Sequence, residues 1–181
     1  MESNFSIFPT EKPDGPLRHV GPQGSEYPFD IRVPVRMERR VTYHHLDLEL
    51  ELLLVFAGER IEIKELRVIG VDGFVATQYL TGLGLPRIIR AIAVSSIPGS
   101  AHWQPDPKEG ESKDLSYKFL AELYWFEHIS WGSPRTALMN YTGWSRANTN
   151  WHLRRIAKEF PLPGPHSSGY QGTRHRDDPR D

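Results

Sequence analysis

Cysteine is absent from this sequence of 181 residues, which excludes disulfide bonds, iron–sulfur clusters, thiol catalysis and zinc sites with cysteine ligands. The sequence also lacks an apolar run near the roughly 20 residues that a membrane-spanning helix needs. Its first residues have neither the basic region nor the apolar region of a secretion signal. We therefore expect a cytoplasmic protein that has no membrane partner.

An excess of charge of one sign is also missing. Lys and Arg together number 22, and Asp and Glu together number 23, which gives a formal net charge of -1. Any affinity for nucleic acid must therefore come from a local basic patch, because the chain as a whole does not attract phosphates. With 38 % hydrophobic residues, the chain is long and apolar enough to bury a core.

Common catalytic and nucleotide-binding motifs are absent as well, since no H-E-x-x-H, G-x-S-x-G or phosphate-binding glycine loop occurs. One set of metal-ligating residues, His45, Asp47 and Glu49, stands at alternate positions of a predicted strand. Such a strip is more typical of the solvated face of an antiparallel sheet. We therefore predict no enzyme, no cofactor and no metal site, with a metal-dependent enzyme using this strip as a rival hypothesis.

Proline and glycine divide the chain into segments. Residues 1–28 are rich in both and show little periodicity, which predicts a flexible N-terminal arm. Residues 161–181 have the same character and are expected to form a disordered tail. A third such stretch, 99–113, predicts a linker between an antiparallel α+β domain over 29–98 and a helical domain over 114–160.

Alternation of apolar and polar residues predicts the strands of the first domain. It runs over residues 29–37 and again over 46–56, where apolar residues occupy every second position. Pro34 lacks a backbone donor, which favours a sheet edge or a bulge for the first strand. Turn signals over 57–60 and at Asp72-Gly73 favour an antiparallel meander.

Apolar residues at helical spacing predict two longer helices. Over 85–97 they recur after Pro86, which suits a first helical turn, and this helix is expected to cover one face of the sheet. A second helix is expected to be capped by Asp114 and to bury a broad face. Its apolar stripe consists of Leu115, Phe119, Leu120, Leu123, Tyr124 and Phe126.

Two shorter helices follow, joined by a sharp turn. Ser133 and Pro134 are typical of a helix start, because the serine can cap and the proline needs no donor there. Gly143 can adopt the left-handed conformation of a tight turn, and Ser145 can cap a second helix over 146–160. Two helices joined by such a short turn are typical of a helix-turn-helix.

The last helix has two different faces. Thr149, Leu153, Ile156 and Phe160 recur at helical spacing and are expected to pack inward. Arg146, Asn150 and Arg154 recur on another side, and these residue types bind guanine and adenine in the major groove. Nearby basic residues suit phosphates, so this segment is the basic patch that a neutral protein would need. The predicted DNA-binding residues are Arg135, Thr136, Ser145, Arg146, Asn150, Trp151, Arg154, Arg155 and Lys158.

The segment over residues 115–163 resembles the C-terminal part of small helix-turn-helix proteins of uncharacterised role from high-GC Gram-positive bacteria and their phages. Those proteins end in a PTxAVAxxxGxSRxTxxRWxRRA type of pattern. The matching residues are Pro134, Ala137, Leu138, Gly143, Ser145, Arg146, Thr149, Arg154 and Arg155. Met139 and His152 depart from the pattern, because a small and an apolar residue are usual there. The resemblance implies DNA binding and leaves the target sequence open.

The sequence thus predicts an α+β protein with an N-terminal antiparallel β-sheet, one helix, and a C-terminal three-helix helix-turn-helix module. Its expected function is to bind double-stranded DNA and regulate transcription from a bacterial or phage promoter. A homodimer is expected because operators usually carry two half-sites, with the strand edge or the helix containing Leu115 as interface. The alternative is an adaptor whose N-terminal sheet binds a partner protein and whose helices only pack.

Overall fold

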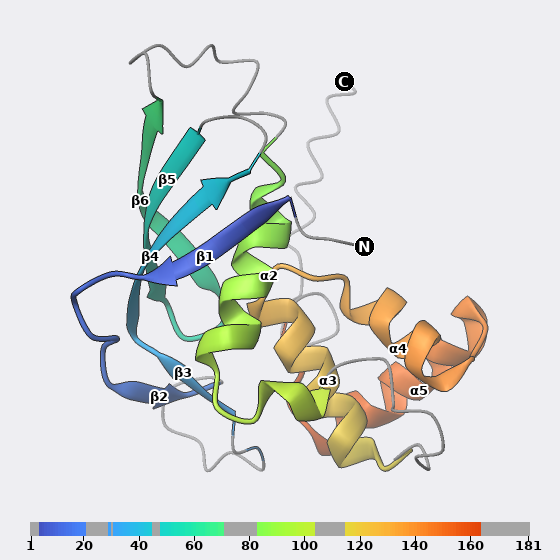
Figure 1. Cartoon of the computed structure of the whole chain (residues 1–181). Helices are drawn as coiled ribbons and strands as arrows, with labels where there is room; N and C mark the ends of the chain where they lie inside the picture. Colours follow the sequence, from blue (N-terminus) through green and yellow to red (C-terminus); the bar gives the residue numbers. More distant parts are fainter. Residues whose placement is uncertain are drawn as a thin grey trace, which may run out of the picture.

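The computed structural model describes residues 4–20, 29, 31–44, 48–70, 83–103 and 115–163. Over these residues the chain is an α+β protein, in which a curved antiparallel sheet is covered on one face by helices (Figure 1). The predicted fold class is confirmed to this extent. Within the described residues, no helix is both long enough and apolar enough to cross a membrane.

The main sheet has four strands in the order β1-β4-β5-β6, and all neighbouring strands are antiparallel. Its strands are β1 (Phe5–Pro9), β4 (Arg36–Tyr43), β5 (Leu48–Phe56) and β6 (Ile61–Gly70). A smaller sheet pairs β2 (Leu17–His19) with β3 (Arg32–Pro34). The predicted meander is confirmed for β4, β5 and β6, whereas Asp72-Gly73 lies outside the described residues.

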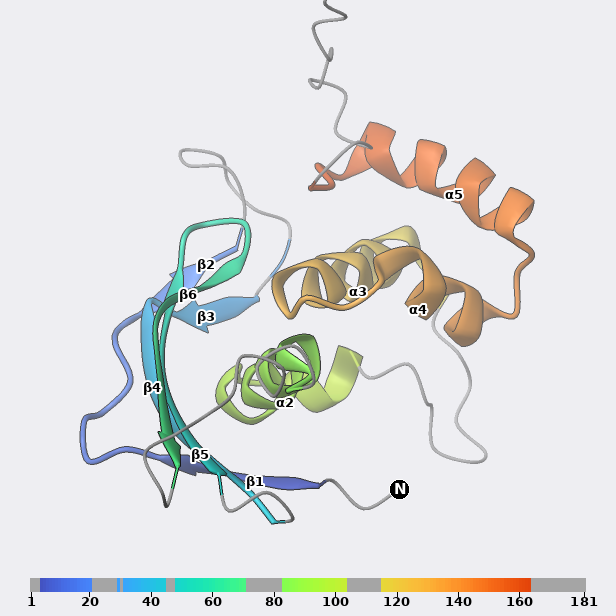
Figure 2. The same cartoon turned by 90° about the horizontal axis from the view of Figure 1, so that it is seen from above.

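One face of the sheet carries the core, as the period-two pattern predicts. Every second side chain of β5 is buried, from Leu48 to Phe56. The helix α2 (Leu85–Ser96) covers this face and buries its own apolar stripe against it (Figure 2). That stripe consists of Ile88, Ile89, Ile92 and Ala93. The predicted helix and its place on the sheet are therefore confirmed.

The remaining helices extend the same core away from the sheet. They are α3 (Tyr117–Ile129), α4 (Pro134–Thr142) and α5 (Arg146–Glu159). Figure 2 shows α2 against the sheet, α3 beyond α2, and α5 on the far side of α3. The helix α3 is buried nearly all round, because it packs against α2 on one side and against the last two helices on the other.

The N-terminal segment differs from the predicted arm over 1–28. Residues 5–9 form the edge strand β1 and residues 17–19 form β2, and both pair with segments further along the chain. The predicted single strand over 29–37 is also wrong, because the chain bends at Val35 between β3 and β4. The backbone N–H of Val35 donates to the carbonyl of Pro16 at 2.9 Å, which ties the bend to this segment.

Contacts among the described residues cross the predicted boundaries of the linker and the tail. Residues 100–103 of the expected linker form the 3-10 helix η1, and Trp103 is buried with its ring centroid 5.7 Å from that of Phe126. Leu162 of the expected tail is buried, and the indole of Trp125 donates to the carbonyl of Pro161 at 2.7 Å. The sheet and all four described α-helices consequently share one hydrophobic core.

The start of α3 also differs from the prediction. Asp114 lies outside the described residues, and the cap is Ser116, whose hydroxyl accepts from the N–H of Phe119. Leu115 precedes the helix and is exposed, so it does not belong to the buried stripe. The other five predicted members of the stripe are buried.

Candidate nucleic-acid interface

A three-residue turn, Gly143 to Ser145, joins α4 to α5 and sets the position of both helices. Gly143 has a φ of 76° and its N–H donates to the carbonyl of Met139 at 2.8 Å, which closes the end of α4. The Ser145 hydroxyl accepts from the N–H of Asn148 at 3.3 Å and caps the start of α5. The predicted turn and the Ser145 cap are therefore confirmed. The predicted Ser133 cap is wrong, because its hydroxyl lies beside that of Thr136 and makes no hydrogen bond that caps the start of α4.

The inner face of α5 fixes its orientation. Thr149, Leu153 and Ile156 are fully buried, and the Thr149 hydroxyl donates to the carbonyl of Ser145 at 3.0 Å. Phe160 is half-buried beyond the helix end, and its ring centroid lies 5.6 Å from that of Phe29. These predicted core positions are occupied as expected, so the opposite side of α5 faces solvent.

The outward face of α5 consists of Ala147, Trp151, Arg154, Arg155 and Lys158, all of which are exposed. The helical spacing of 100° per residue places Trp151 and Lys158 at its centre. Arg146 is exposed at the start of the helix, between this face and the core. The acidic Glu159 is exposed at the end of α5, so basic residues dominate this surface.

Two other predicted contact residues, Asn150 and Arg135, are half-buried, whereas Thr136 is exposed. Asn150 is half-buried, and its amide oxygen is buried with no hydrogen-bond partner among the described residues. Arg135 is half-buried in α4. Burial raises the pKa of Tyr124, and the charge of Arg135 partly opposes this rise. Thr136 is exposed, and its hydroxyl lies 2.9 Å from that of Ser133. The structure thus places Asn150 at the margin of α5 and not at its outward centre.

An aromatic cluster holds the turn and α5 against the start of α3. The imidazole of His152 stacks on the indole of Trp144, with ring centroids 3.7 Å apart and an interplanar angle of 12°. The hydroxyl of Tyr117 lies 3.2 Å from Nδ1 of His152. Burial, and then the charge of Arg155, lowers the pKa of His152. Sequence reasoning missed this role of His152, which the spacing of single aromatic residues does not reveal.

The end of α3 anchors these helices to the rest of the fold. Trp131 follows α3 with a φ of 59°, a conformation that bulky residues adopt rarely. Its indole donates to the carbonyl of Ile61 in β6 at 2.5 Å, and the guanidinium of Arg60 lies 4.8 Å from its ring centroid. These contacts connect the helices that carry the outward face of α5 to the sheet.

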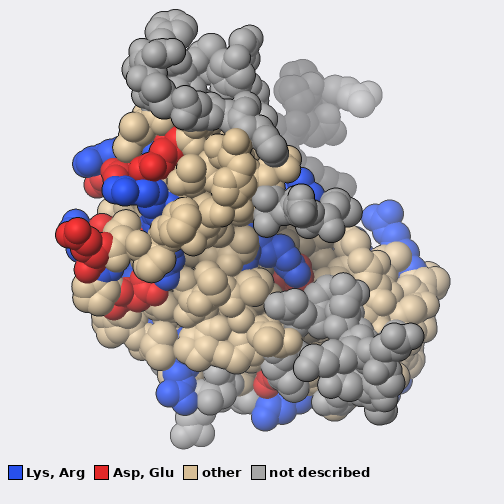
Figure 3. Space-filling view, viewed as in Figure 1, with Lys and Arg blue, Asp and Glu red and all other residues tan. Residues whose placement is uncertain are grey.

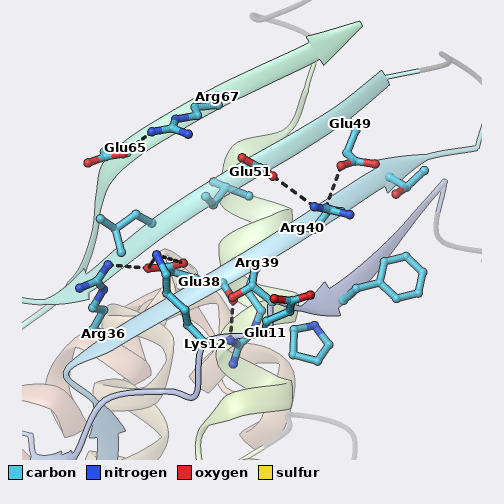
Figure 4. A pocket seen from close by; sticks show the side chains of 16 residues that line it. Glu11, Lys12, Arg36, Glu38, Arg39, Arg40, Glu49, Glu51, Glu65 and Arg67 are labelled. Atoms are coloured by element: carbon cyan, nitrogen blue, oxygen red, sulfur yellow. Dashed lines mark hydrogen bonds and ion pairs between the residues drawn. The ribbon is translucent and has the colours of Figure 1, made fainter. Parts of the chain in front are cut away.

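A second candidate surface is the solvent-facing side of the main sheet, where a shallow hollow of about 820 Å³ is lined largely by charged residues (Figure 4). Arg40 lies between Glu49 and Glu51, at 2.8 and 3.3 Å. Glu38 in turn accepts from Arg36 and Lys12. The opposite charges neutralise one another, so this hollow offers no field of one sign to a ligand.

The rival metal-site hypothesis falls largely on residues outside the described part of the chain. His45 and Asp47 lie outside the described residues, and the carboxylate of Glu49 is engaged by Arg40. Among the described residues, no group of three His, Asp or Glu side chains is arranged to hold a metal ion.

Comparisons of the chain with protein-family models, with curated proteins and with solved structures found no match. A proposal for its function therefore rests on its own residues and their arrangement.

Proposed function

We propose that the protein binds double-stranded DNA through a helix-turn-helix formed by α4 and α5, and that it regulates transcription from a bacterial or phage promoter in the cytoplasm. The observation that carries this proposal is the outward face of α5, where Arg154, Arg155 and Lys158 are exposed beside Trp151. A helix has the width of the major groove, and its arginine side chains can bind guanine through two hydrogen bonds. An exposed row of basic residues on a well-anchored helix is what such a contact requires.

The distribution of charge over the molecule supports this surface over the sheet. Figure 3 shows acidic and basic side chains intermingled over the strands. On the outward face of α5, by contrast, the exposed charged residues are Arg154, Arg155 and Lys158, with no acidic residue among them. Phosphates are attracted by a local excess of basic residues and not by paired charges. DNA would therefore approach the α4–α5 side of the molecule.

In this arrangement the residues have separate tasks. We assign Arg146, at the start of α5, and Arg154 to base edges, and Arg155 and Lys158 to the phosphates. Thr136 at the start of α4 suits the backbone that the first helix of such a motif crosses. Asn150 can contact adenine only if its amide turns outward, because its oxygen is now buried.

A homodimer remains part of the proposal, because an operator with two half-sites is matched by two copies of the protein. The exposed side chains at Phe8 in β1 and at Leu115 before α3 are two surfaces through which copies could meet. Cross-linking and light scattering of the protein with and without a bound duplex would establish the stoichiometry.

The proposal is tested by selecting bound fragments from a pool of random duplex DNA. A sequence-specific protein enriches a common motif, and the enriched duplex then binds more tightly than a scrambled duplex of equal length. If no motif is enriched and no duplex is bound at low salt, the DNA-binding proposal is wrong. A Glu49→Gln and Glu51→Gln variant is the matched control, because it alters only the charged face of the sheet.

A further inference from the structure

Trp151 is an unusual residue at the centre of a basic surface. Its side chain is 49 % exposed, and no other large hydrophobic side chain within the helices α2, α3, α4 and α5 themselves is exposed. A surface that only binds phosphates has no use for an indole, since phosphates are bound by charge and hydrogen bonds. An apolar partner would remove the exposed part of Trp151 from water.

The indole is held in place by its neighbours. The guanidinium of Arg155 lies over the ring at 4.6 Å from its centroid. His152 contacts the ring edge-on, with centroids 4.7 Å apart and an interplanar angle of 89°, and Trp144 holds His152 in turn. Because the ring is already ordered, binding a partner loses little side-chain entropy.

The surroundings of the indole indicate the chemistry of that partner. Ala147, one helical turn before Trp151, is also exposed, so the two residues form an apolar strip along the middle of the outward face. Arg154 lies beside this strip, and Lys158 follows it toward the end of α5. In the major groove the apolar group that ordinary base pairs present is the 5-methyl group of thymine.

We propose that Trp151, with Ala147, contacts the methyl group of thymine, so that the preferred target carries thymine opposite the middle of α5. This inference rests on the proposed DNA-binding function and names the base that the site recognises. Stacking on an unpaired base is less favoured, because Arg155 already covers one face of the indole. The contact adds to the specificity of the base-contacting arginines, whereas the charges that bind phosphates act on every sequence alike.

The test replaces each thymine of the selected duplex, one at a time, by deoxyuridine, which lacks only the methyl group. At one or two positions we expect the affinity for the duplex to fall about threefold to tenfold, because one buried methyl contact is lost. A 5-methylcytosine–guanine pair at that position, compared with cytosine–guanine, should regain affinity. In the Trp151→Ala variant both differences should disappear, whereas Lys158→Ala should keep them and lower affinity for all duplexes.

The outcomes separate this inference from the proposed function. If the selected duplex binds but deoxyuridine is tolerated at every position, or if Trp151→Ala keeps the methyl effect, the thymine contact is wrong and DNA binding stands. If single strands bind more tightly than the duplex and lose this preference in Trp151→Ala, the indole stacks on bases and the inference is overturned. If no duplex is bound, both proposals fail. Circular dichroism confirms that each variant is folded.

Discussion

The two carboxylate oxygens of Glu127 accept hydrogen bonds from both terminal nitrogens of Arg90, at 2.5 and 2.6 Å. This pair joins α2, which lies on the sheet, to α3, which supports α4 and α5. The side chain of Glu127 is only 3 % exposed, whereas that of Arg90 is 31 % exposed. The pair thus crosses the boundary at which the sequence predicts two separate domains.

Breaking this pair should destabilise the whole protein. Arg90→Ala leaves a buried carboxylate without its partner, and we expect a loss of about 3 kcal/mol in the free energy of unfolding, measured in urea. Arg67→Ala is the control, because its pair with Glu65 spans 3.7 Å on the surface and should contribute little. Equal losses for the two variants would show that the buried pair does not join the helices.

Gly132 should be intolerant of a side chain for the same reason. A Cβ there would lie 2.0 Å from Oε2 of Glu127 and 2.8 Å from Arg90, so Gly132→Ala has to displace the pair. We expect its loss of stability to be non-additive with that of Arg90→Ala, because both changes disrupt one interaction. Gly143→Ala is the comparison, since a Cβ there meets no atom within 4 Å and only its φ of 76° causes strain. Strict additivity of Gly132→Ala and Arg90→Ala would contradict the account.

The helical part should not fold alone. A fragment over residues 114–160 lacks Trp103, Ile61 and Pro161, which contact Phe126, Trp131 and Trp125 in the full chain. We expect its circular dichroism and amide spectra to show a largely unfolded peptide, because much of its apolar surface loses its partner. A fragment that folds cooperatively would restore the interpretation of 99–113 as a linker between independent domains.

Acidification should weaken the folded state through two histidines. Burial lowers the pKa of His128, with a further contribution from Arg60, and burial followed by Arg155 lowers that of His152. A histidine with a lowered pKa binds fewer protons in the folded state than in the unfolded state. Its contribution to the free energy of unfolding is therefore complete above about pH 6.5 and is lost as the pH falls through the folded pKa. Urea unfolding at several pH values should therefore show that the free energy of unfolding depends less on pH in His128→Gln and His152→Gln than in the parent. An unchanged dependence in both variants would contradict the burial of these rings.

Local patterns predicted the parts of the fold that depend on neighbours in sequence. The alternation over β5 gave the buried face of the sheet, and Gly143 and Ser145 gave the turn and cap of α5. The strands β1 and β2 were missed because they are short and pair with residues far along the chain, where no local periodicity signals them. Element boundaries set by local chemistry were therefore predictable, and long-range pairing was not.

Buried charges were missed for a related reason. Arg39 stands on the inner side of β4 and is 7 % exposed, where its guanidinium contacts Asp14 at 2.6 Å and the hydroxyl of Ser96 at 2.6 Å. The sequence around Arg39 does not indicate these partners, because they come from another loop and from the end of α2. The same limit applies to Asn150, because the helical repeat gives its side of α5 but not how far neighbouring elements cover it.

The central claim is that the exposed arginines of α5 recognise DNA, and the most direct test measures the binding of folded Arg146→Ala, Arg154→Ala and Arg155→Ala proteins. Each is titrated with the selected duplex and with a scrambled duplex at several salt concentrations. Arg146→Ala and Arg154→Ala should lose about 1 to 3 kcal/mol on the selected duplex and little on the scrambled one, because a base contact is removed. Arg155→Ala should weaken both and reduce the salt dependence by about one counterion. If all three variants bind both duplexes as the parent does, α5 does not recognise DNA, and the protein is better explained as an adaptor whose helices only pack.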